Sequence, residues 1–383
     1  MKRMLDPQAA PAAGVEARYR ELTPASLAAF ERAHPLVPGG APGGLAGMRP
    51  YPVSITRGQA CHVWDADGRR LVDMMQGDWL LPLGHGNPQV VEAITAQLAK
   101  GTTFAAPDPD LAHDFVRLLQ SRMPSLERMR FSVSGTEAVM HALRIARVAT
   151  GRPKVAKMRG GYHGTYDPSL IANYRWKDPD HIPPGLAPGT VENLVLLAFN
   201  DVERTAAALE RHGRQVAAII VEPVIGGSGM IPADREYLQA LRELADQYGI
   251  VLVLDEMVTF TYGPHGAQGH YGITPDLTTL GKAIGGGLPL AAFGGKAELM
   301  DLCDGSLHGG APPVRHAATF GGIPISLAAG IAAVRQLAPA VHAELHRLGD
   351  RVRSGITGLG RRYGIPLQAT GAAHYFCIQW TRT

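Results

Sequence analysis

The sequence predicts an α/β fold in which helices cover both faces of a large, mostly parallel sheet. Three observations favour this class: short apolar runs recur along the chain, segments of helical length separate them, and a glycine follows several of those segments. Strands that are apolar on both faces and alternate with helices are typical of parallel sheets. The 383 residues are 45% hydrophobic and 19% charged, so the chain can bury a large core and form a smaller second domain.

The first part of the chain predicts an irregular arm and a β-hairpin. The arm is the Pro/Gly-rich stretch from His34 to Pro52, which we expect to be ordered without regular structure. The pair Asp67-Gly68 separates two runs of strand character, Cys61–Asp65 and Arg70–Met74. An Asp-Gly pair between such runs is the short-range signature of a tight hairpin turn.

The alternating elements follow in chain order. A helix is expected from Asn87-Pro88 to Gly101 because an N-cap and a first-turn proline precede apolar residues at helical spacing. The expected strands are Met129–Val133, Val155–Met158, Leu194–Ala198, Val216–Val221, Ile250–Leu254 and Leu277–Leu280. The expected helices between them are Glu137–Thr150, Asp201–His212 and Asp234–Tyr248, with Gly151, Gly213 and Gly249 as C-caps.

The end of the chain predicts a second structural region. After Phe320, the segments Pro324–Leu337 and Val341–Tyr363 predict consecutive helices, and His374–Trp380 predicts a strand. We therefore expect an N-terminal arm with a small-domain segment over residues 1–75, a large domain over 76–325, and a small C-terminal domain over 326–383.

Composition excludes several function classes. The formal net charge is +3, and Lys and Arg are scattered, so no nucleic-acid partner is expected. No apolar run has the length of a signal peptide core or a membrane span, which predicts a cytosolic protein without a membrane partner. The cysteines Cys61, Cys303 and Cys377 lie far apart, so neither a metal site nor a disulfide framework is predicted.

The first chemical signal is Ser134-Gly135-Thr136-Glu137, between an expected strand and the following helix. Such a turn directs backbone N–H groups and two hydroxyls to the positive end of the helix dipole, where a phosphate fits. The alternative is a capping box, in which Ser134 caps the helix and Glu137 reciprocates.

The second signal is the run Ile250–Leu254, which leads directly into Asp255 and Glu256. A carboxylate at the end of a buried strand is costly unless it meets a partner. Asp255 therefore suits a cationic ring nitrogen such as a pyridinium. The alternatives are that Asp255 caps the next loop or binds a metal.

The third signal is Lys282, which follows an expected strand and has Gly281 before it and Gly285, Gly286 and Gly287 after it. The glycines leave room for another molecule to approach the amine. A lysine in cationic or apolar surroundings loses proton affinity and becomes a nucleophile towards aldehydes. An isolated lysine is more commonly a solvated surface group, so only the context of the other two signals favours this role.

In this order along one α/β sheet, the three signals resemble the class III (subgroup II) pyridoxal 5′-phosphate (PLP)-dependent aminotransferases. The resemblance runs from about Pro38 to Ala329 and is strongest to glutamate-1-semialdehyde aminomutase and the β-amino-acid aminotransferases. The segments that carry it are Trp64–Gly68, Leu83–Pro88, Gly101–Pro107, Ser134–Ala138, Gly160–Gly164, Val221–Val224, Asp255-Glu256 and Leu280–Gly287. It implies the PLP-dependent transferase fold type I, similar to aspartate aminotransferase.

The resemblance assigns the catalytic residues. Lys282 would form the Schiff base with PLP and move a proton between the substrate carbon and the cofactor. Asp255 would keep the pyridine nitrogen protonated, so that the ring accepts electrons when the substrate C–H bond breaks. The pyridoxamine 5′-phosphate form would carry the amino group between a small-molecule amino donor and a carbonyl acceptor.

The resemblance also implies the remaining cofactor contacts. Ser134, Gly135 and Thr136 would hold the phosphate, while Tyr162 would stack on one face of the ring and Met257 would pack on the other. The family usually has valine where Met257 stands.

Thr319 matches a threonine that reaches the phosphate in the neighbouring subunit, so the resemblance implies a homodimer. His163 is a further candidate for cofactor binding, and Trp79 and Glu222 are candidates for the substrate pocket. The alternatives are that Tyr162 is a core aromatic, that His163 is a satisfied core histidine, and that Glu222 caps the turn that follows it.

Two departures from the family concern the substrate. The family often places a carboxylate-binding arginine soon after Asp255, where this chain reads Phe260-Thr261-Tyr262. The β-amino-acid enzymes have an arginine after the paired glycines of the arm, where this chain reads Gly39 to Gly44, and Arg49 is a nearby substitute. The sequence also ends before the last elements expected of the family's small domain.

Three functions are compatible with these residues. The first is an aminotransferase acting on an amino acid, a β-amino acid or an amine. The second is an aminomutase, which the stretches Gly101–Pro107 and Asp178–Thr190 favour because they resemble the semialdehyde enzyme. The third is a PLP-binding protein without turnover, against which the intact Lys282 and Asp255 argue.

Overall fold

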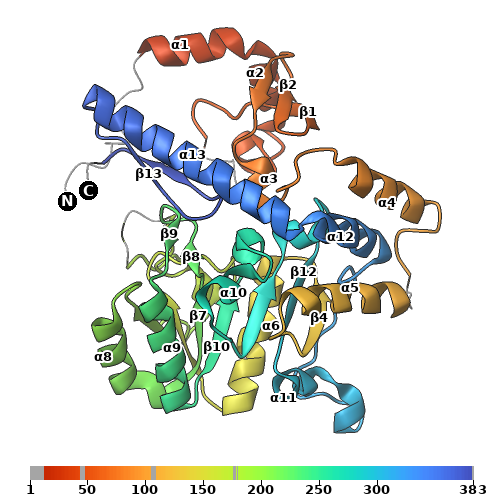
Figure 1. Cartoon of the computed structure of the whole chain (residues 1–383), viewed down its shortest axis with the longest axis vertical. Helices are drawn as coiled ribbons and strands as arrows, with labels where there is room; N and C mark the ends of the chain where they lie inside the picture. Colours follow the sequence, from red (N-terminus) through yellow and green to blue (C-terminus); the bar gives the residue numbers. More distant parts are fainter. Residues whose placement is uncertain (1–12, 44–47, 105–108, 176–177, 179, 382–383) are drawn as a thin grey trace. The chain divides into compact units, whose positions relative to one another are not determined.

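The computed structural model of the chain (Figure 1) describes residues 13–43, 48–104, 109–175, 178 and 180–381. The chain divides into two compact units, Met1–Pro88 and Gln89–Thr383. Each unit is built around its own sheet.

The first unit contains three short strands and several short helices. The helices are α1 (Ala13–Leu22), α2 (Pro24–Ala33), the 3₁₀ turn η1 (Pro38–Gly40) and α3 (Gln76–Trp79), and the strands are β1 (Ile55–Gln59), β2 (His62–Asp65) and β3 (Arg70–Val72). The predicted hairpin is confirmed, because β2 and β3 pair antiparallel with Trp64 opposite Arg70. Gly68 takes a φ of 79° in its turn, which glycine adopts without steric cost.

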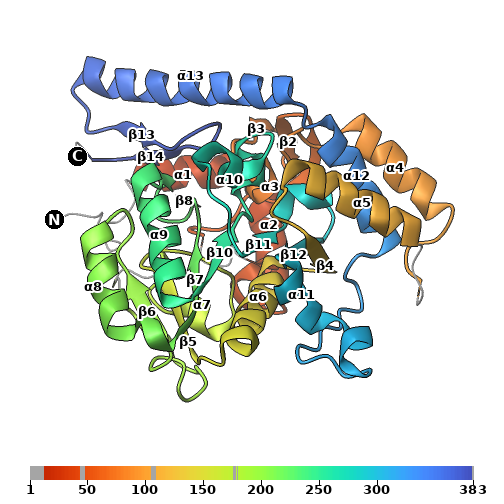
Figure 2. The same ribbon diagram turned by 60° about the horizontal axis from the view of Figure 1, so that its bottom comes forward.

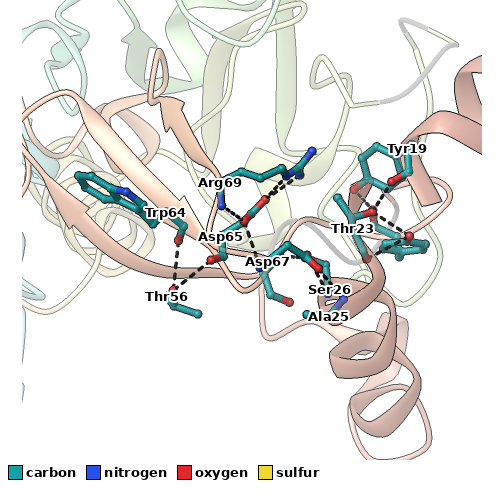
Figure 3. A network of polar contacts seen from close by, with 11 residues as sticks. Tyr19, Thr23, Ala25, Ser26, Thr56, Trp64, Asp65, Asp67 and Arg69 are labelled. Carbon is teal, nitrogen blue, oxygen red and sulfur yellow. Dashed lines mark hydrogen bonds and ion pairs between the residues drawn. The ribbon is translucent and has the colours of Figure 1, made fainter. Parts of the chain in front are cut away.

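The hairpin turn also caps a helix of the same unit. Asp65 accepts hydrogen bonds from the backbone N–H groups of Asp67 (3.1 Å) and Arg69 (2.8 Å), which fixes the turn (Figure 3). The Asp67 carboxylate then accepts from the backbone N–H of Ala25 (2.7 Å) and from the hydroxyl of Ser26 (3.1 Å). The side chain of Thr23, the N-cap residue of α2, makes no capping bond, so Asp67 satisfies the start of that helix instead.

The second unit is built on a seven-stranded mixed sheet with the order β4-β12-β11-β10-β7-β5-β6. Its strands are β4 (Arg128–Ser132), β5 (Lys154–Met158), β6 (Leu194–Leu197), β7 (Val216–Val221), β10 (Val251–Asp255), β11 (Leu277–Leu280) and β12 (Ala291–Gly295). The expected strands from Met129 to Leu280 are all present, within a few residues of the predicted bounds. Every residue of β7, β10 and β11 is buried, as expected of a sheet covered on both faces.

Strand β12 was not predicted. It pairs antiparallel with β11 on one side and with β4 on the other. Its sequence, Ala-Ala-Phe-Gly-Gly, has no β-branched residue, so local propensity does not mark it as a strand. The two glycines allow close approach, since a Cβ on Gly295 would lie 2.0 Å from the backbone oxygen of Asp276.

α-Helices make up much of the chain from Pro88 onward. They are α4 (Pro88–Leu98), α5 (Pro109–Arg122), α6 (Gly135–Thr150), α7 (Asp167–Leu170), α8 (Val202–His212), α9 (Arg235–Tyr248), α10 (Gly266–Tyr271), α11 (Ala297–Met300), α12 (Pro324–Gln336) and α13 (Pro339–Tyr363). Helix α6 packs on β7, β11 and β12, and α8 lies beside α9 (Figure 2). The predicted helices are confirmed, and Gly151 and Gly249 take the left-handed C-cap conformation.

Gly213 is the C-cap of α8, as predicted, but it does not take the left-handed conformation of Gly151 and Gly249. Its φ is −54°, and it begins the short 3₁₀ turn η2 (Gly213–Gln215) instead. The ring of Tyr248 explains the tight packing here, because a Cβ on Gly213 would lie 2.8 Å from it. Glycine is therefore required for space at this position, not for backbone handedness.

The remaining elements are short. They are β8 (Val224–Ile225), β9 (Ile231–Pro232), β13 (Gln368–Thr370), β14 (Cys377–Gln379) and the 3₁₀ turns η3 (Thr259–Tyr262), η4 (Lys282–Gly285), η5 (Asp301–Cys303) and η6 (Gly305–His308). The strand predicted over His374–Trp380 is present as β14, with β13 as its antiparallel partner. Among the described residues, no single helix is long and apolar enough to cross a membrane; α12 and α13 pass that test together, but they are bent by 75°.

A buried lysine fixes one crossover of the sheet. Lys157 on β5 is 1% exposed, and its ammonium group donates to the backbone oxygens of Ile171 (2.8 Å) and Ser169 (3.2 Å). Burial lowers the pKa of Lys157 to about 8, and the charge of Glu222 opposes that shift.

We predict that Lys157 makes the protein more stable as the pH rises from 8 to 10.5. Its folded-state pKa lies below the ordinary value of 10.5, so the folded state is penalised while the group is charged, and the penalty disappears as the proton leaves. The full effect is about 3 kcal/mol. Urea unfolding of the native protein and Lys157→Met at several pH values would measure it, and parallel pH profiles for the two proteins would contradict the prediction.

A second prediction concerns Gly330 on α12, which lets that helix approach the turn η4. A Cβ on Gly330 would lie 2.3 Å from the backbone oxygen of Ile284 and 2.8 Å from the Phe115 ring. Gly330→Ala should therefore destabilise the protein by about 1–3 kcal/mol. Gly358→Ala on α13, where nothing lies within 4 Å, should stabilise it by about 0.5–1 kcal/mol. Thermal unfolding of both variants measures the contrast, and equal shifts would show that α12 is not tightly packed.

Candidate active site

Asp255 lies at the carboxyl end of β10, in the middle of the sheet. It is 3% exposed, and β10 pairs with β11 so that Asp255 stands opposite Thr279. The Thr279 hydroxyl donates to Asp255 Oδ1 (2.9 Å), and the backbone N–H of Met257 donates to the same oxygen (3.2 Å). These bonds fix the carboxylate at the edge of the sheet where ligands bind in open α/β folds.

The other carboxylate oxygen of Asp255 is paired with His163. The distance from His163 Nδ1 to Asp255 Oδ2 is 2.7 Å, and the histidine is 2% exposed. Nε2 of the same ring is buried without a hydrogen-bond partner among the described residues. His163 is therefore not a fully satisfied core histidine, and its paired nitrogen orients the Asp255 carboxylate.

Glu222 joins the same cluster from the end of β7. It is 7% exposed and accepts from the backbone N–H groups of Tyr162 (2.7 Å) and Gly226 (3.2 Å). Burial raises the pKa of Glu222, while His163 acts in the opposite direction. Glu222 therefore ties the segment that carries Tyr162 and His163 to the turn that follows β7, as the capping alternative expects. Its role in a substrate pocket stays a prediction.

The turn before α6 has the geometry of a helix cap. Ser134 Oγ accepts from the backbone N–H of Glu137 (3.3 Å), and the Glu137 carboxylate accepts from the backbone N–H of Val133 (2.9 Å). The capping alternative is therefore real, although Glu137 reaches the residue before the cap. These two capping bonds do not involve the backbone N–H groups of Gly135 and Thr136. Such first-turn N–H groups have no acceptor within their own helix. A phosphate remains compatible with the turn.

The Gly160–Gly164 segment lies against this helix start. The backbone N–H of Thr165 donates to Thr136 Oγ1 (3.1 Å). A Cβ on Gly164 would lie 2.3 Å from the same hydroxyl oxygen, and Gly164 has a φ of 86°. Glycine is therefore required beside Thr136, and the predicted phosphate turn lies next to the segment that holds His163.

Lys282 follows β11, three residues after Thr279, and begins the turn η4. It has a φ of 50°, in the left-handed region that few residues other than glycine occupy. Backbone strain of this kind is concentrated at functional sites.

The side chain of Met257 lies between the lysine turn and the helix start. A Cβ on Gly281 would lie 2.2 Å from Met257 Sδ, and a Cβ on Gly135 would lie 2.8 Å from Met257 Cε. Met257 therefore lies between the residue before Lys282 and the turn that begins α6.

Two further predicted site residues come from other parts of the chain. Trp79 belongs to the first unit, where it ends α3 with a φ of 64°. Thr319 is exposed in a turn of the second unit. The roles assigned to them stay predictions.

The aromatic and cationic neighbours of Tyr162 were not predicted from the sequence. Its ring meets that of Tyr174 edge to face, with 5.7 Å between the centroids. The guanidinium carbon of Arg175 lies 5.6 Å from the Tyr162 centroid and 5.3 Å from that of Tyr174. No spacing along the chain signals this contact, because Arg175 reaches Tyr162 only through the path of the loop.

One group of potential metal ligands occurs among the described residues. Glu137, His141 and His316 each offer a ligand atom, and these atoms lie within 4.8 Å of one another. Burial lowers the pKa of His141 to about 4 and also lowers that of His316. The rings of His141 and His316 meet edge to face, with 4.6 Å between the centroids, so the cluster links α6 to the segment that leads to Thr319. The expected absence of a metal stays a prediction.

Residues 46–370 match the aminotransferase class-III family. A glutamate-1-semialdehyde 2,1-aminomutase from Geobacillus kaustophilus is 41% identical over 347 residues, which are 89% of this chain and 80% of that protein. An omega-transaminase from Sphaerobacter thermophilus has a similar structure, with a TM-score of 0.89, 38% identity and coverage of 95% of this chain and 84% of that chain.

A transaminase structure with PLP bound is also similar, with a TM-score of 0.89, 35% identity and coverage of 93% of this chain and 84% of that chain. The family match sets aside the alternative of a protein without turnover. The fold, the order of the site residues and these likenesses agree: the chain belongs to the class III aminotransferases, enzymes of fold type I.

Proposed function

We propose that this enzyme is an aminotransferase that moves an amino group from a small-molecule donor to a carbonyl acceptor. The observation that carries the proposal is the buried Asp255 carboxylate. It is held by His163 and Thr279 at the sheet edge, in register with the strand that leads to Lys282. A chain that no longer used the cofactor would gain nothing from a charge buried at this position.

The enzyme uses PLP, the cofactor of its family. PLP supplies an aldehyde that exchanges with amines and a ring that accepts electrons when the bond to hydrogen breaks at the amine-bearing carbon. The residues fit this group. The buried carboxylate of Asp255 suits the ring nitrogen, the start of α6 suits the phosphate, and Lys282, which follows the strand paired with β10, supplies an amine.

Asp255 holds a proton on the ring nitrogen through its negative charge. His163 and Thr279 bind one carboxylate oxygen each, so the side chain cannot rotate away from the sheet edge. A fixed charge in a buried site acts strongly because no water reorganises around it.

Lys282 has two roles in the proposal. Its Nζ would hold the cofactor through the aldehyde group, and the same amine would accept and return the proton at the donor's amine-bearing carbon. Lys282 has a left-handed backbone with a φ of 50°, and the neighbouring glycines leave room for the cofactor to approach its amine.

The remaining proposed contacts are with the phosphate and the ring faces of PLP. Ser134, Gly135 and Thr136 hold the phosphate, and Tyr162 and Met257 pack on the two faces of the ring. The position of Met257 against Gly135 and Gly281 supports this role, since Gly135 belongs to the proposed phosphate turn and Gly281 precedes Lys282.

Thr319 is proposed to reach the phosphate in the neighbouring subunit of a homodimer. Its exposure in one chain is compatible with that role. Trp79 and Glu222 remain proposed for the substrate pocket, and a cytosolic location remains a prediction.

An aminomutase is the second candidate. The 41% identity to a glutamate-1-semialdehyde 2,1-aminomutase favours it. A mutase moves the amine within one molecule and needs no external acceptor, whereas an aminotransferase requires one.

The first test of the proposal is spectroscopic. PLP added to the purified protein should give a visible absorption band that Lys282→Ala lacks, because Nζ is the group that binds the aldehyde. One class of donor, among α-amino acids, β-amino acids and simple amines, should then convert the band to that of pyridoxamine phosphate. Turnover of glutamate-1-semialdehyde without any keto acid would favour the mutase, and absence of the band would reject the proposed site.

The second test asks whether turnover requires the negative charge of Asp255 or only a side chain of its shape. Asp255→Asn keeps an oxygen that can accept from Thr279 but removes the negative charge. We expect PLP to remain bound while turnover falls about 10²-fold to 10³-fold, since a fixed stabilising charge is lost. Asp276→Asn, which alters another buried carboxylate, one that directly precedes β11 and pairs with Arg242, should leave turnover almost unchanged. Equal losses in both variants would assign Asp255 a structural role only.

A further inference from the structure

The position soon after Asp255, where this family often carries a substrate-binding arginine, is described in the structure and holds no cation. Phe260, Thr261 and Tyr262 are buried in η3, with exposures of 4%, 3% and 5%. The Thr261 hydroxyl is engaged with the Tyr375 hydroxyl (2.6 Å) and lies 3.3 Å from His374 Nε2. This segment is part of the packing between η3 and the C-terminal elements, so it does not hold a substrate carboxylate.

Arg175 presents a cation next to the proposed cofactor site instead. Its guanidinium lies over the rings of Tyr162 and Tyr174, at 5.6 and 5.3 Å from their centroids. Tyr162 is the residue proposed to stack on the cofactor, and it directly precedes His163, the partner of Asp255. Arg175 is therefore separated from the proposed ring position by one aromatic side chain.

The guanidinium of Arg175 is exposed, and no carboxylate pairs with it within the described part of the chain. Arg159 lies in the same connection between β5 and β6. Its guanidinium, unlike that of Arg175, forms an ion pair with a carboxylate, that of Asp180. Aromatic faces hold an arginine in place without using its N–H donors. Arg175 consequently keeps its planar set of donors available for a bidentate carboxylate.

Buried contacts fix the backbone that leads to Arg175. Lys157 binds the Ile171 carbonyl (2.8 Å), and the Asn173 side chain accepts from the backbone N–H of Arg175 (2.9 Å). Tyr174 fits against Gly227 so closely that a Cβ there would lie 2.0 Å from its ring. These contacts limit the positions that the arginine can reach, which reduces the entropy that binding would cost.

We propose that Arg175 binds the carboxylate of the substrate, so that the preferred donors and acceptors are amino acids and keto acids and not simple amines. The inference rests on the proposed function, since it requires the cofactor to lie against Tyr162. It holds for an aminotransferase and for a mutase whose substrate carries a carboxylate.

The test compares donors that differ only by a carboxylate. The probes are L-alanine with ethylamine, and 3-aminobutanoate with 2-aminopropane, each assayed with the PLP-loaded full-length enzyme. Hydrogen bonds between charged groups contribute about 1.5–3 kcal/mol. Arg175→Ala should therefore raise the KM of the carboxylate donor about 10-fold to 100-fold with little change in kcat, and it should leave the amine and the PLP band unchanged.

A matched control is Arg362→Ala, which removes an arginine that stacks on Tyr363 at 5.4 Å on the last turn of α13. It should alter neither donor. Arg175→Lys keeps the charge but not the planar donors, so it should restore only part of the affinity.

An unreactive probe makes the result independent of turnover. 3-Methylbutanoate has the shape of 3-aminobutanoate, and its binding to the PLP-loaded enzyme can be followed by calorimetry. Weaker binding to Arg175→Ala than to the native and Arg362→Ala proteins supports the inference. Equal binding to all three, or equal loss of activity with carboxylate and amine donors, overturns it. A native protein without a PLP band overturns the proposed function itself, and the inference with it.

Discussion

The second unit depends on how a negative charge is held inside its sheet. Asp255 ends a strand in which every residue is buried, so its carboxylate must find partners within the protein. Thr279, His163 and the backbone N–H of Met257 provide them, and each comes from a different part of the chain. This requirement brings the end of β11, the loop after β5 and the start of the turn after β10 to one point. A cofactor with a cationic ring nitrogen completes the arrangement.

Several glycines allow the close packing around this carboxylate, because a side chain at their positions would clash with a neighbour. Gly135 and Gly281 leave room for Met257, and Gly164 leaves room for Thr136. Gly330 of α12 leaves room for the backbone of Ile284, so that this helix approaches η4, the turn that carries Lys282. The strained backbone of Lys282 is therefore supported by neighbours on several sides, which is the condition under which proteins retain such strain.

Patterns of neighbouring residues in the sequence made most strands of the large sheet predictable. The runs Val216–Val221 and Ile250–Leu254 are apolar on both faces, which only a covered sheet accommodates, and the strands lie close to the predicted positions. Strand β12 could not be predicted, because its small residues are selected by contact with β4 and β11 and not by their own propensity. The reason for glycine at position 213 is also not local, since the ring that leaves no room for a Cβ there belongs to Tyr248, 35 residues away along the chain.

The sequence by itself determined the family, the order of the chemical residues and the identity of the cofactor-binding lysine candidate, because these depend on short motifs whose meaning is local. The tertiary structure alone decided which groups meet. It paired His163 with Asp255, used Glu222 to tie two loops, and placed Arg175 against Tyr162. Such contacts join residues from different crossovers, and the distance between them is set by the register of the strands and the path of the loops, which no spacing along the chain encodes.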